Sequence, residues 1–135
     1  MGSSGGKIPE GDKGATGPPG ETGAKATLGE WKSLTLEAGI TNKGEESSNA
    51  QYTKDSMGFG YLRGAVKSSG LLSKEATLAI ISIAEYRPAK IQTFTANLGG
   101  AVGDLVILPN GKIQISIGVS LENPFYFDGI FFPLV

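Results

Sequence analysis

The chain has 135 residues, of which 12 are basic and 13 acidic, and its net charge is −1. No basic stripe is present to neutralise phosphates and no apolar run approaches the ~18 residues that cross a bilayer, so we expect neither nucleic-acid binding nor membrane insertion. Cysteine and histidine are absent. This removes the usual ligands of zinc and redox metals, the Cys nucleophile and the Ser-His-Asp triad, and it predicts a non-enzymatic protein without a cofactor.

Glycine occupies every third position from residue 11 to residue 23, in the run GDKGATGPPGETGAK. Only glycine fits at the shared axis of a collagen-like triple helix, so this spacing predicts that three chains wind together over residues 11–25. A flexible Gly-rich linker is the alternative interpretation. Five triplets are too few to hold a trimer alone, so we expect the following domain, or sequence upstream, to bring the chains together. Residues 1–10 are expected to be a leader or a cloning remnant without ordered structure.

Residues 26–135 are enough for one compact domain, a head that follows the collagen-like stem. Short β-rich runs between turn residues predict an all-β fold, an antiparallel β-sandwich of jelly-roll type. A long polar loop is expected over residues 37–49 and a turn over residues 55–58. The glycines near residues 60 and 64 predict a bulge or a close backbone approach. The expected strands of the first half lie at residues 31–36, 51–54 and 59–67.

The second half of the head contains the clearest hairpin, with its turn at Pro109-Asn110-Gly111. Its first arm is apolar on both faces at residues 105–108, which favours contact of one face with a neighbouring subunit. The sequence Tyr86-Arg87-Pro88 is expected to fix a turn, because proline holds the preceding residue extended. The expected strands of this half lie at residues 77–84, 90–97, 104–108, 112–119 and 126–132.

Five segments follow one another between Trp31 and Phe132: WKSLTLEAGI, QYTKDSMGFGYLRGAVKSSG, AEYRPAKIQTFTA, VILPNGKIQI and FYFDGIFF. This order resembles the C-terminal head domains of tail-fibre and receptor-binding proteins from bacteriophages of Gram-positive hosts. The segment AIISIAEYRPAK departs from the pattern, because it lacks a Leu-Pro pair before the Tyr-Arg-Pro.

The resemblance implies a trimeric β-sandwich head that binds cell-wall saccharides of the host. It also implies a location at the tail tip of a virion, outside the cell when acting, with attachment to other tail or baseplate proteins through upstream sequence. Two alternatives remain open. The head could be a structural cap that only trimerises, or it could belong to the collagen-tailed jelly-roll trimers of the complement or tumour-necrosis-factor kind.

A saccharide site combines an aromatic platform with carboxylate, amide and arginine groups that contact the hydroxyls. The candidate ligand-binding residues are therefore Trp31, Tyr52, Arg63 and Asp104, expected at the rim of the head near a subunit boundary. Each also has a structural interpretation: packing for the two aromatic residues, a partner carboxylate or solvent for the arginine, and a turn cap for the aspartate. The adjacent pair Glu45-Glu46 would face opposite ways on a strand, which argues against a glycosidase.

Overall fold

The computed structural model describes residues 26–98 and 100–134, and nearly all regular structure within them is β-strand. Its one helical element in this part of the chain is a short 3-10 helix, η1 (Ala84–Tyr86). All strand pairs are antiparallel. The prediction of an all-β fold built from antiparallel sheets is therefore confirmed. The stem expected over residues 11–25 and the leader over residues 1–10 lie outside the described residues.

The described strands form four sheets. The four-stranded sheet has the spatial order β1 (Lys32–Ser33), β4 (Gln51–Lys54), β5 (Phe59–Arg63) and β14 (Phe131–Pro133). The five-stranded sheet has the order β2 (Thr35–Leu36), β8 (Thr77–Ile80), β11 (Lys112–Ile115), β10 (Ala101–Ile107) and β9 (Gln92–Leu98). The smaller sheets are β13 (Phe125–Tyr126), β6 (Ala65–Ser68), β3 (Ile40–Asn42), and the pair β12 (Val119–Ser120) and β7 (Leu71–Leu72).

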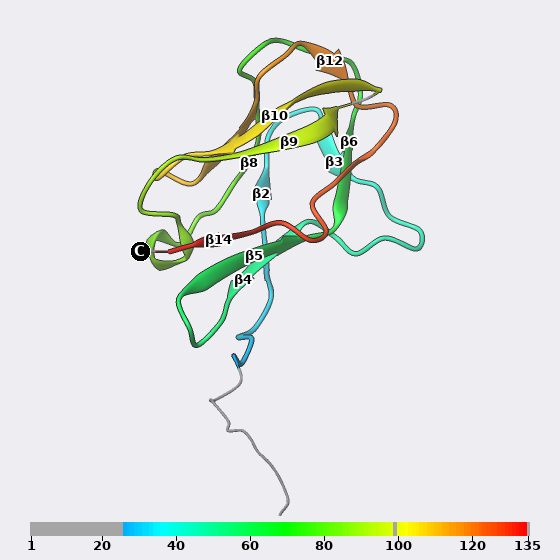
Figure 1. Cartoon of the computed structure of the whole chain (residues 1–135). Coiled ribbons are helices and arrows are strands. Elements are labelled where there is room, and N and C mark those ends of the chain that lie inside the picture. Colours follow the sequence, from blue (N-terminus) through cyan, green and yellow to red (C-terminus); the bar gives the residue numbers. More distant parts are fainter. Residues whose placement is uncertain (1–25, 99, 135) are drawn as a thin grey trace, which may run out of the picture.

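The hydrophobic core draws on both larger sheets, which lie one above the other in Figure 1. Leu62 and Phe132 come from the four-stranded sheet and Leu105 and Ile113 from the five-stranded sheet, and all four side chains are buried in one cluster. Burying a side chain of this size stabilises the folded chain by roughly 1.5–3 kcal/mol. The arrangement is compatible with a β-sandwich.

Two expected strands are divided where the chain passes from one sheet to another. The run 31–36 separates at Leu34, so that β1 joins the four-stranded sheet and β2 the five-stranded sheet. The run 59–67 separates at Gly64, which has φ +102°. A Cβ at Gly64 would collide with the backbone carbonyl of Asn49. The close backbone approach predicted from this glycine is therefore confirmed.

Two other expectations need correction. Residues 37–49 are not wholly loop, because β3 lies within them and pairs with β6 through Ile40, whose side chain is buried. The run 126–132 is not one strand either. Asp128 and Gly129 form a turn between β13 and β14, and Gly129 has φ +85°. A positive φ ends the extended backbone at this point.

The predicted hairpin is present between β10 and β11, with Leu105 opposite Ile115 and Ile107 opposite Ile113. These four side chains are buried. Val106 points to the other face and is only partly buried. In the Tyr-Arg-Pro segment, Tyr86 is the last residue of η1, and Arg87, which precedes the proline, has the extended conformation that ends the helix.

Candidate functional site

Trp31 and Arg63, two of the four predicted ligand-binding residues, lie together on the outer face of the four-stranded sheet. The guanidinium carbon of Arg63 lies 4.1 Å from the centroid of the indole ring. Arg63 also donates a hydrogen bond of 2.8 Å from Nε to Oε1 of Gln51, its neighbour on β4. The arginine thus covers one face of the predicted aromatic platform, and both side chains are engaged within the protein.

Tyr52 is 2% exposed and belongs to the hydrophobic core. Its ring packs edge-to-face against Tyr86, with the ring centroids 5.3 Å apart. Tyr52 therefore presents almost no surface to a ligand in this structure, because strand alternation places this residue on the buried face of β4. The structural interpretation, packing of the aromatic ring, describes its position.

Asp104 lies in a different sheet, on β10, opposite Thr95 of β9. It is not in a turn. Its backbone N–H donates to Oγ of Ser116 at 2.8 Å, and the N–H of Ser116 donates to the carbonyl oxygen of Asp104 at 3.0 Å. These bonds continue the hairpin beyond β11. The structure thus brings Trp31 and Arg63 together and leaves Tyr52 and Asp104 apart from them.

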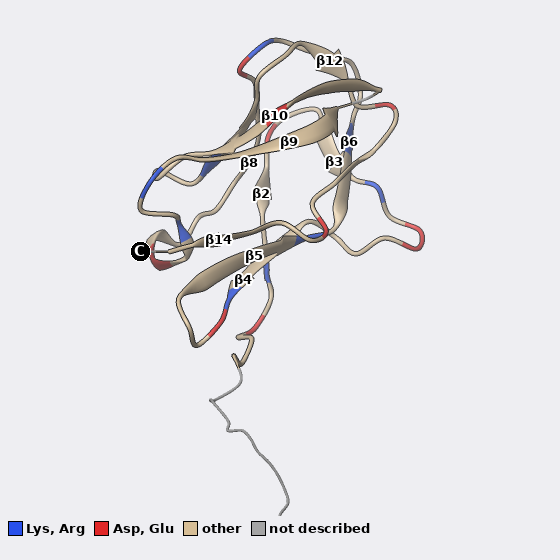
Figure 2. Cartoon of the chain, in the orientation of Figure 1, with Lys and Arg blue, Asp and Glu red and all other residues tan. Residues whose placement is uncertain are grey.

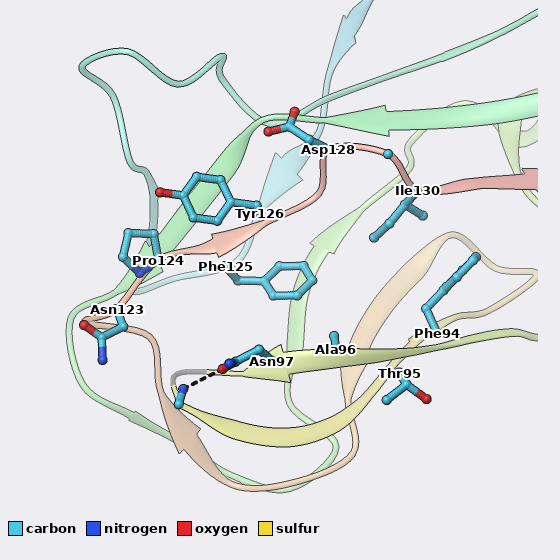
Figure 3. A pocket seen from close by; sticks show the side chains of 12 residues that line it. Phe94, Thr95, Ala96, Asn97, Asn123, Pro124, Phe125, Tyr126, Asp128 and Ile130 are labelled. Carbon is cyan, nitrogen blue, oxygen red and sulfur yellow. Dashed lines mark hydrogen bonds between the residues drawn. The ribbon is translucent and has the colours of Figure 1, made fainter.

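A groove of about 740 Å³ lies between β9 and the segment of residues 123–130, as Figure 3 shows. None of the four predicted residues lines it. Its lining combines aromatic and aliphatic side chains with amides and one carboxylate. The lining residues are Phe94, Thr95, Ala96, Asn97, Gly100, Asn123, Pro124, Phe125, Tyr126, Asp128, Gly129 and Ile130.

One wall of the groove is the outer edge of the five-stranded sheet. β9 ends the strand order and pairs only with β10. Among the described residues, no backbone hydrogen bond joins β9 to the segment of residues 123–130. The groove exists because these two pieces of backbone face each other without pairing. An edge strand left open in this way presents unpaired N–H and C=O groups to whatever lies in the groove.

The opposite wall is held in place by hydrogen bonds to Gly64. The backbone N–H of Phe127 donates to the carbonyl oxygen of Gly64 at 2.7 Å, and the N–H of Gly64 donates to Oδ1 of Asp128 at 2.9 Å. Phe125 pairs with Val66 on β6 and packs edge-to-face against Phe127 at 5.1 Å. These contacts fix the wall to β6, so the groove is largely pre-formed.

The polar groups of the groove surround an apolar centre. In Figure 3, Phe94, Phe125 and Ile130 project into the space between the two walls, and Tyr126 and Asp128 lie at its upper side. Tyr126 is 49% exposed. Asn97 accepts the N–H of Gly100 through Oδ1 at 2.8 Å, which caps the β9–β10 turn. An apolar surface with amide, hydroxyl and carboxylate groups at its margin can bind a ligand that has both C–H faces and hydroxyls.

The charges near the groove are few. Among the described residues, Asp128 is the one charged residue in its lining, and β9 carries none. Figure 2 shows the described Lys, Arg, Asp and Glu residues dispersed over the head, many of them in turns. The groove therefore offers no cation to a phosphate or carboxylate group.

A second polar arrangement, at Asp55, organises the β4–β5 turn. Oδ1 of Asp55 accepts the backbone N–H groups of Met57 at 2.9 Å and Phe59 at 3.0 Å, and Oδ2 accepts the hydroxyl of Tyr61 at 2.6 Å. These bonds hold the pKa of Asp55 below its ordinary value, with the hydrogen bond from Tyr61 as the largest cause. The same bond raises the pKa of Tyr61. This carboxylate stabilises a turn and is not aimed at a cavity.

Comparison with known proteins yields no matching family model and no matching curated protein. The described part of the chain contains no group of three or more Asp or Glu side chains placed to hold a metal ion. No helix in the same residues is long and apolar enough to cross a membrane. The groove is therefore interpreted from its own geometry.

Proposed function

We propose that this protein is a non-catalytic recognition domain for a cell-wall saccharide of a Gram-positive bacterium, acting as a homotrimer at the tail tip of a bacteriophage. The trimer, the collagen-like stem and the β-sandwich head are parts of this proposal. The single observation that carries the binding function is the groove beside β9, with its aromatic centre and polar margin.

The groove suits a saccharide better than the predicted pair Trp31 and Arg63 does. Sugars stack a C–H face on an aromatic ring and satisfy their hydroxyls with amides, carboxylates and backbone groups. Tyr126 and the partly exposed Phe94 supply the rings, Asn97 and Asp128 supply polar groups, and the β9 edge supplies backbone groups. The absence of Lys and Arg from the lining favours a neutral saccharide over a phosphate-rich polymer.

Trimerisation would raise the avidity of a weak site. A groove open to solvent buries only part of a sugar, so the affinity of one copy is expected to be low. Three copies on one stem, and several stems on one virion, increase the effective affinity ~100-fold or more without new contacts.

The structural cap is the competing function. In that case the head only holds three stems together, and a different protein binds the host; a collagen-tailed jelly-roll surface protein would be of this kind. The open groove, which a cap does not need, favours recognition.

The test uses a fluorescent fusion of the full chain, applied to a panel of Gram-positive strains. We expect labelling of at least one strain and inhibition of that labelling by its purified wall polysaccharide. The variant Tyr126→Ala should reduce labelling ~10-fold, because aromatic anchors dominate binding energy at such sites. The matched control is Leu71→Ala, which truncates an 82% exposed side chain on β7, outside the groove lining.

Two outcomes would contradict the proposal in different ways. If a folded parent protein labels no strain, the structural cap is favoured. If the parent labels cells and Tyr126→Ala labels them equally well, saccharide recognition stands but the groove is not its site.

A further inference from the structure

Three aromatic side chains lie together on the outer face of β5 and β14. Tyr61 stacks on Phe131 with ring centroids 6.1 Å apart and an interplanar angle of 28°. The ring centroid of Phe59 also lies 6.1 Å from that of Phe131, with an interplanar angle of 55°. Phe131 is 55% exposed and Phe59 is 37% exposed. We call Phe59, Tyr61 and Phe131 the aromatic face. The strand register places them there, because Phe131 is directly opposite Tyr61.

Two exposed aliphatic side chains lie at the same end of the sheet. Met57, in the β4–β5 turn, is 59% exposed, and Leu28, which forms an isolated bridge with Asp55, is 49% exposed. The remaining exposed large apolar residues of the described chain lie outside this sheet: Leu71, Ile83, Ile91, Val102 and Tyr126. Apolar exposure on the head is thus concentrated beside this turn, and such a concentration marks an interaction surface.

The described chain begins beside this turn, as Figure 1 shows below β4 and β5. Ser56 donates its N–H to the carbonyl oxygen of Thr27 at 3.0 Å, and Gly29 donates to the carbonyl oxygen of Lys54 at 2.9 Å. From residue 26 to residue 29 an extended chain covers at most about 10 Å. The last triplet of the Gly-X-Y repeat ends at residue 25. Three chains joined at the axis of that repeat would therefore bring three β4–β5 turns close together.

We propose that the aromatic face, together with Leu28 and Met57, is the surface through which three copies of this chain contact one another beside the stem. The occupant of the surface is a second copy, related by the threefold axis of the repeat. This inference rests on the trimer of the proposed function and adds the place where the heads meet.

The electrostatics of the surface fit contact between identical copies. None of its five side chains is charged, so identical surfaces meet without repulsion between like charges. The hydroxyl of Tyr61 is already bonded to the buried carboxylate of Asp55. The ring can therefore be buried without leaving an unpaired polar group. Arg63, the nearest cation along β5, is held by Trp31 and Gln51.

The absence of native cysteine allows a direct test by cross-linking in the full chain. In the Met57→Cys variant, a short bismaleimide reagent should join the cysteines of two copies. The product is a covalent dimer on a denaturing gel. Leu71→Cys, at a position that is more exposed than Met57 and lies on β7, should give none. Phe131→Ser should raise the concentration at which half the trimer dissociates ~10-fold or more, measured by sedimentation velocity, with Leu71→Ser as control. Circular dichroism and thermal melting verify that each variant is folded.

The outcomes separate this inference from the proposed function. A parent chain that is monomeric at all concentrations overturns both the trimer and this interface. A trimeric parent whose Met57→Cys variant does not cross-link overturns the interface alone, and saccharide binding by the groove is unaffected. A Phe131→Ser variant that dissociates like the parent and no longer labels cells would also overturn the interface, because the face would then be a ligand surface.

Discussion

The hydroxyl of Tyr61 donates a hydrogen bond of 2.6 Å to Oδ2 of Asp55, and this bond links the middle of β5 to the turn that precedes it. The turn also contacts the first described residues of the chain, since Ser56 donates its N–H to Thr27. One side-chain pair therefore connects the aromatic face to the entry point of the head. The protonation states of Asp55 and Tyr61 are coupled to folding.

The pair predicts how stability depends on pH. The folded-state pKa of Asp55 is lowered, so its contribution to stability is present above the unfolded pKa of about 4 and is lost as the pH falls through the folded value. The pKa of Tyr61 is raised, so its contribution is present below about pH 10 and is lost as the pH rises through the folded value. Tyr61→Phe should be less stable than the parent at pH 7, and the difference should shrink below pH ~4.

Urea denaturation between pH 2 and pH 7 measures this difference. Tyr126→Phe is the matched control, because it removes the hydroxyl of an exposed tyrosine that has no carboxylate partner among the described residues. A constant difference between Tyr61→Phe and the parent across the whole range would show that the Asp55–Tyr61 bond is not the source.

Gly64→Ala should be strongly destabilising. The residue has φ +102°, and an added Cβ would overlap the backbone of Asn49, which cannot move without disturbing the strand that follows. We expect a loss of roughly 3 kcal/mol or more in the free energy of unfolding. Gly58→Ala separates the two causes, because Gly58 has φ +95° and open space around its Cα. It should lose only about 1–2 kcal/mol.

Gly64→Ala also tests the role of Gly64 in holding the groove wall. The carbonyl oxygen of Gly64 accepts the N–H of Phe127, and the N–H of Gly64 donates to Oδ1 of Asp128. If Gly64→Ala folds, its labelling of cells should fall more than that of Gly58→Ala at equal trimer content. Equal loss of stability in the two variants would contradict the role of the close approach.

Arg87→Lys should weaken the contact between the residue that follows η1 and the residues that precede it. The guanidinium donates from Nε to the carbonyl oxygen of Ile81 at 2.8 Å and from Nη2 to that of Ser82 at 3.0 Å. A lysine ammonium cannot reproduce this two-point geometry. We expect a loss of about 1–2 kcal/mol in the free energy of unfolding, measured by urea denaturation. A change within ~0.3 kcal/mol would mean that solvent replaces both bonds.

The features predicted from sequence were those with local physical causes. The turn at Asn110-Gly111 and the close approach at Gly64 follow from backbone conformations that only certain residues adopt. The three-residue strand at Ile40 was missed, because it is too short to show alternation and depends on pairing with β6. The contact between the guanidinium of Arg63 and the indole of Trp31 was not predicted either, because the two residues are far apart in sequence and were interpreted as separate ligand contacts.

The groove could not be predicted for a related reason. Asn97 and Asp128 are 31 positions apart in sequence, and they share a cavity only because the segment after β13 faces the free edge of β9 without pairing with it. The one sequence signal available was the aromatic run FYFDGIFF. Its alternation indicates buried Phe125 and Phe127 with Tyr126 exposed between them, as the structure has them.

Binding in the groove should depend little on salt. Asp128 is its one charged lining residue, so a neutral saccharide would bind without charge pairing. We expect the Kd for the purified wall polysaccharide to change less than ~2-fold between 0.05 M and 0.5 M NaCl, because screening acts on charge pairs and leaves stacking and neutral hydrogen bonds nearly unchanged.

Asn97→Lys adds a cation beside the apolar centre and should not improve binding of a neutral ligand. A Kd that rises steeply with salt, or that falls in Asn97→Lys, would identify an anionic wall polymer as the ligand instead. The double variant Asn97→Lys/Lys67→Gln controls for net charge, because Lys67 lies on β6 outside the lining and its loss offsets the added lysine.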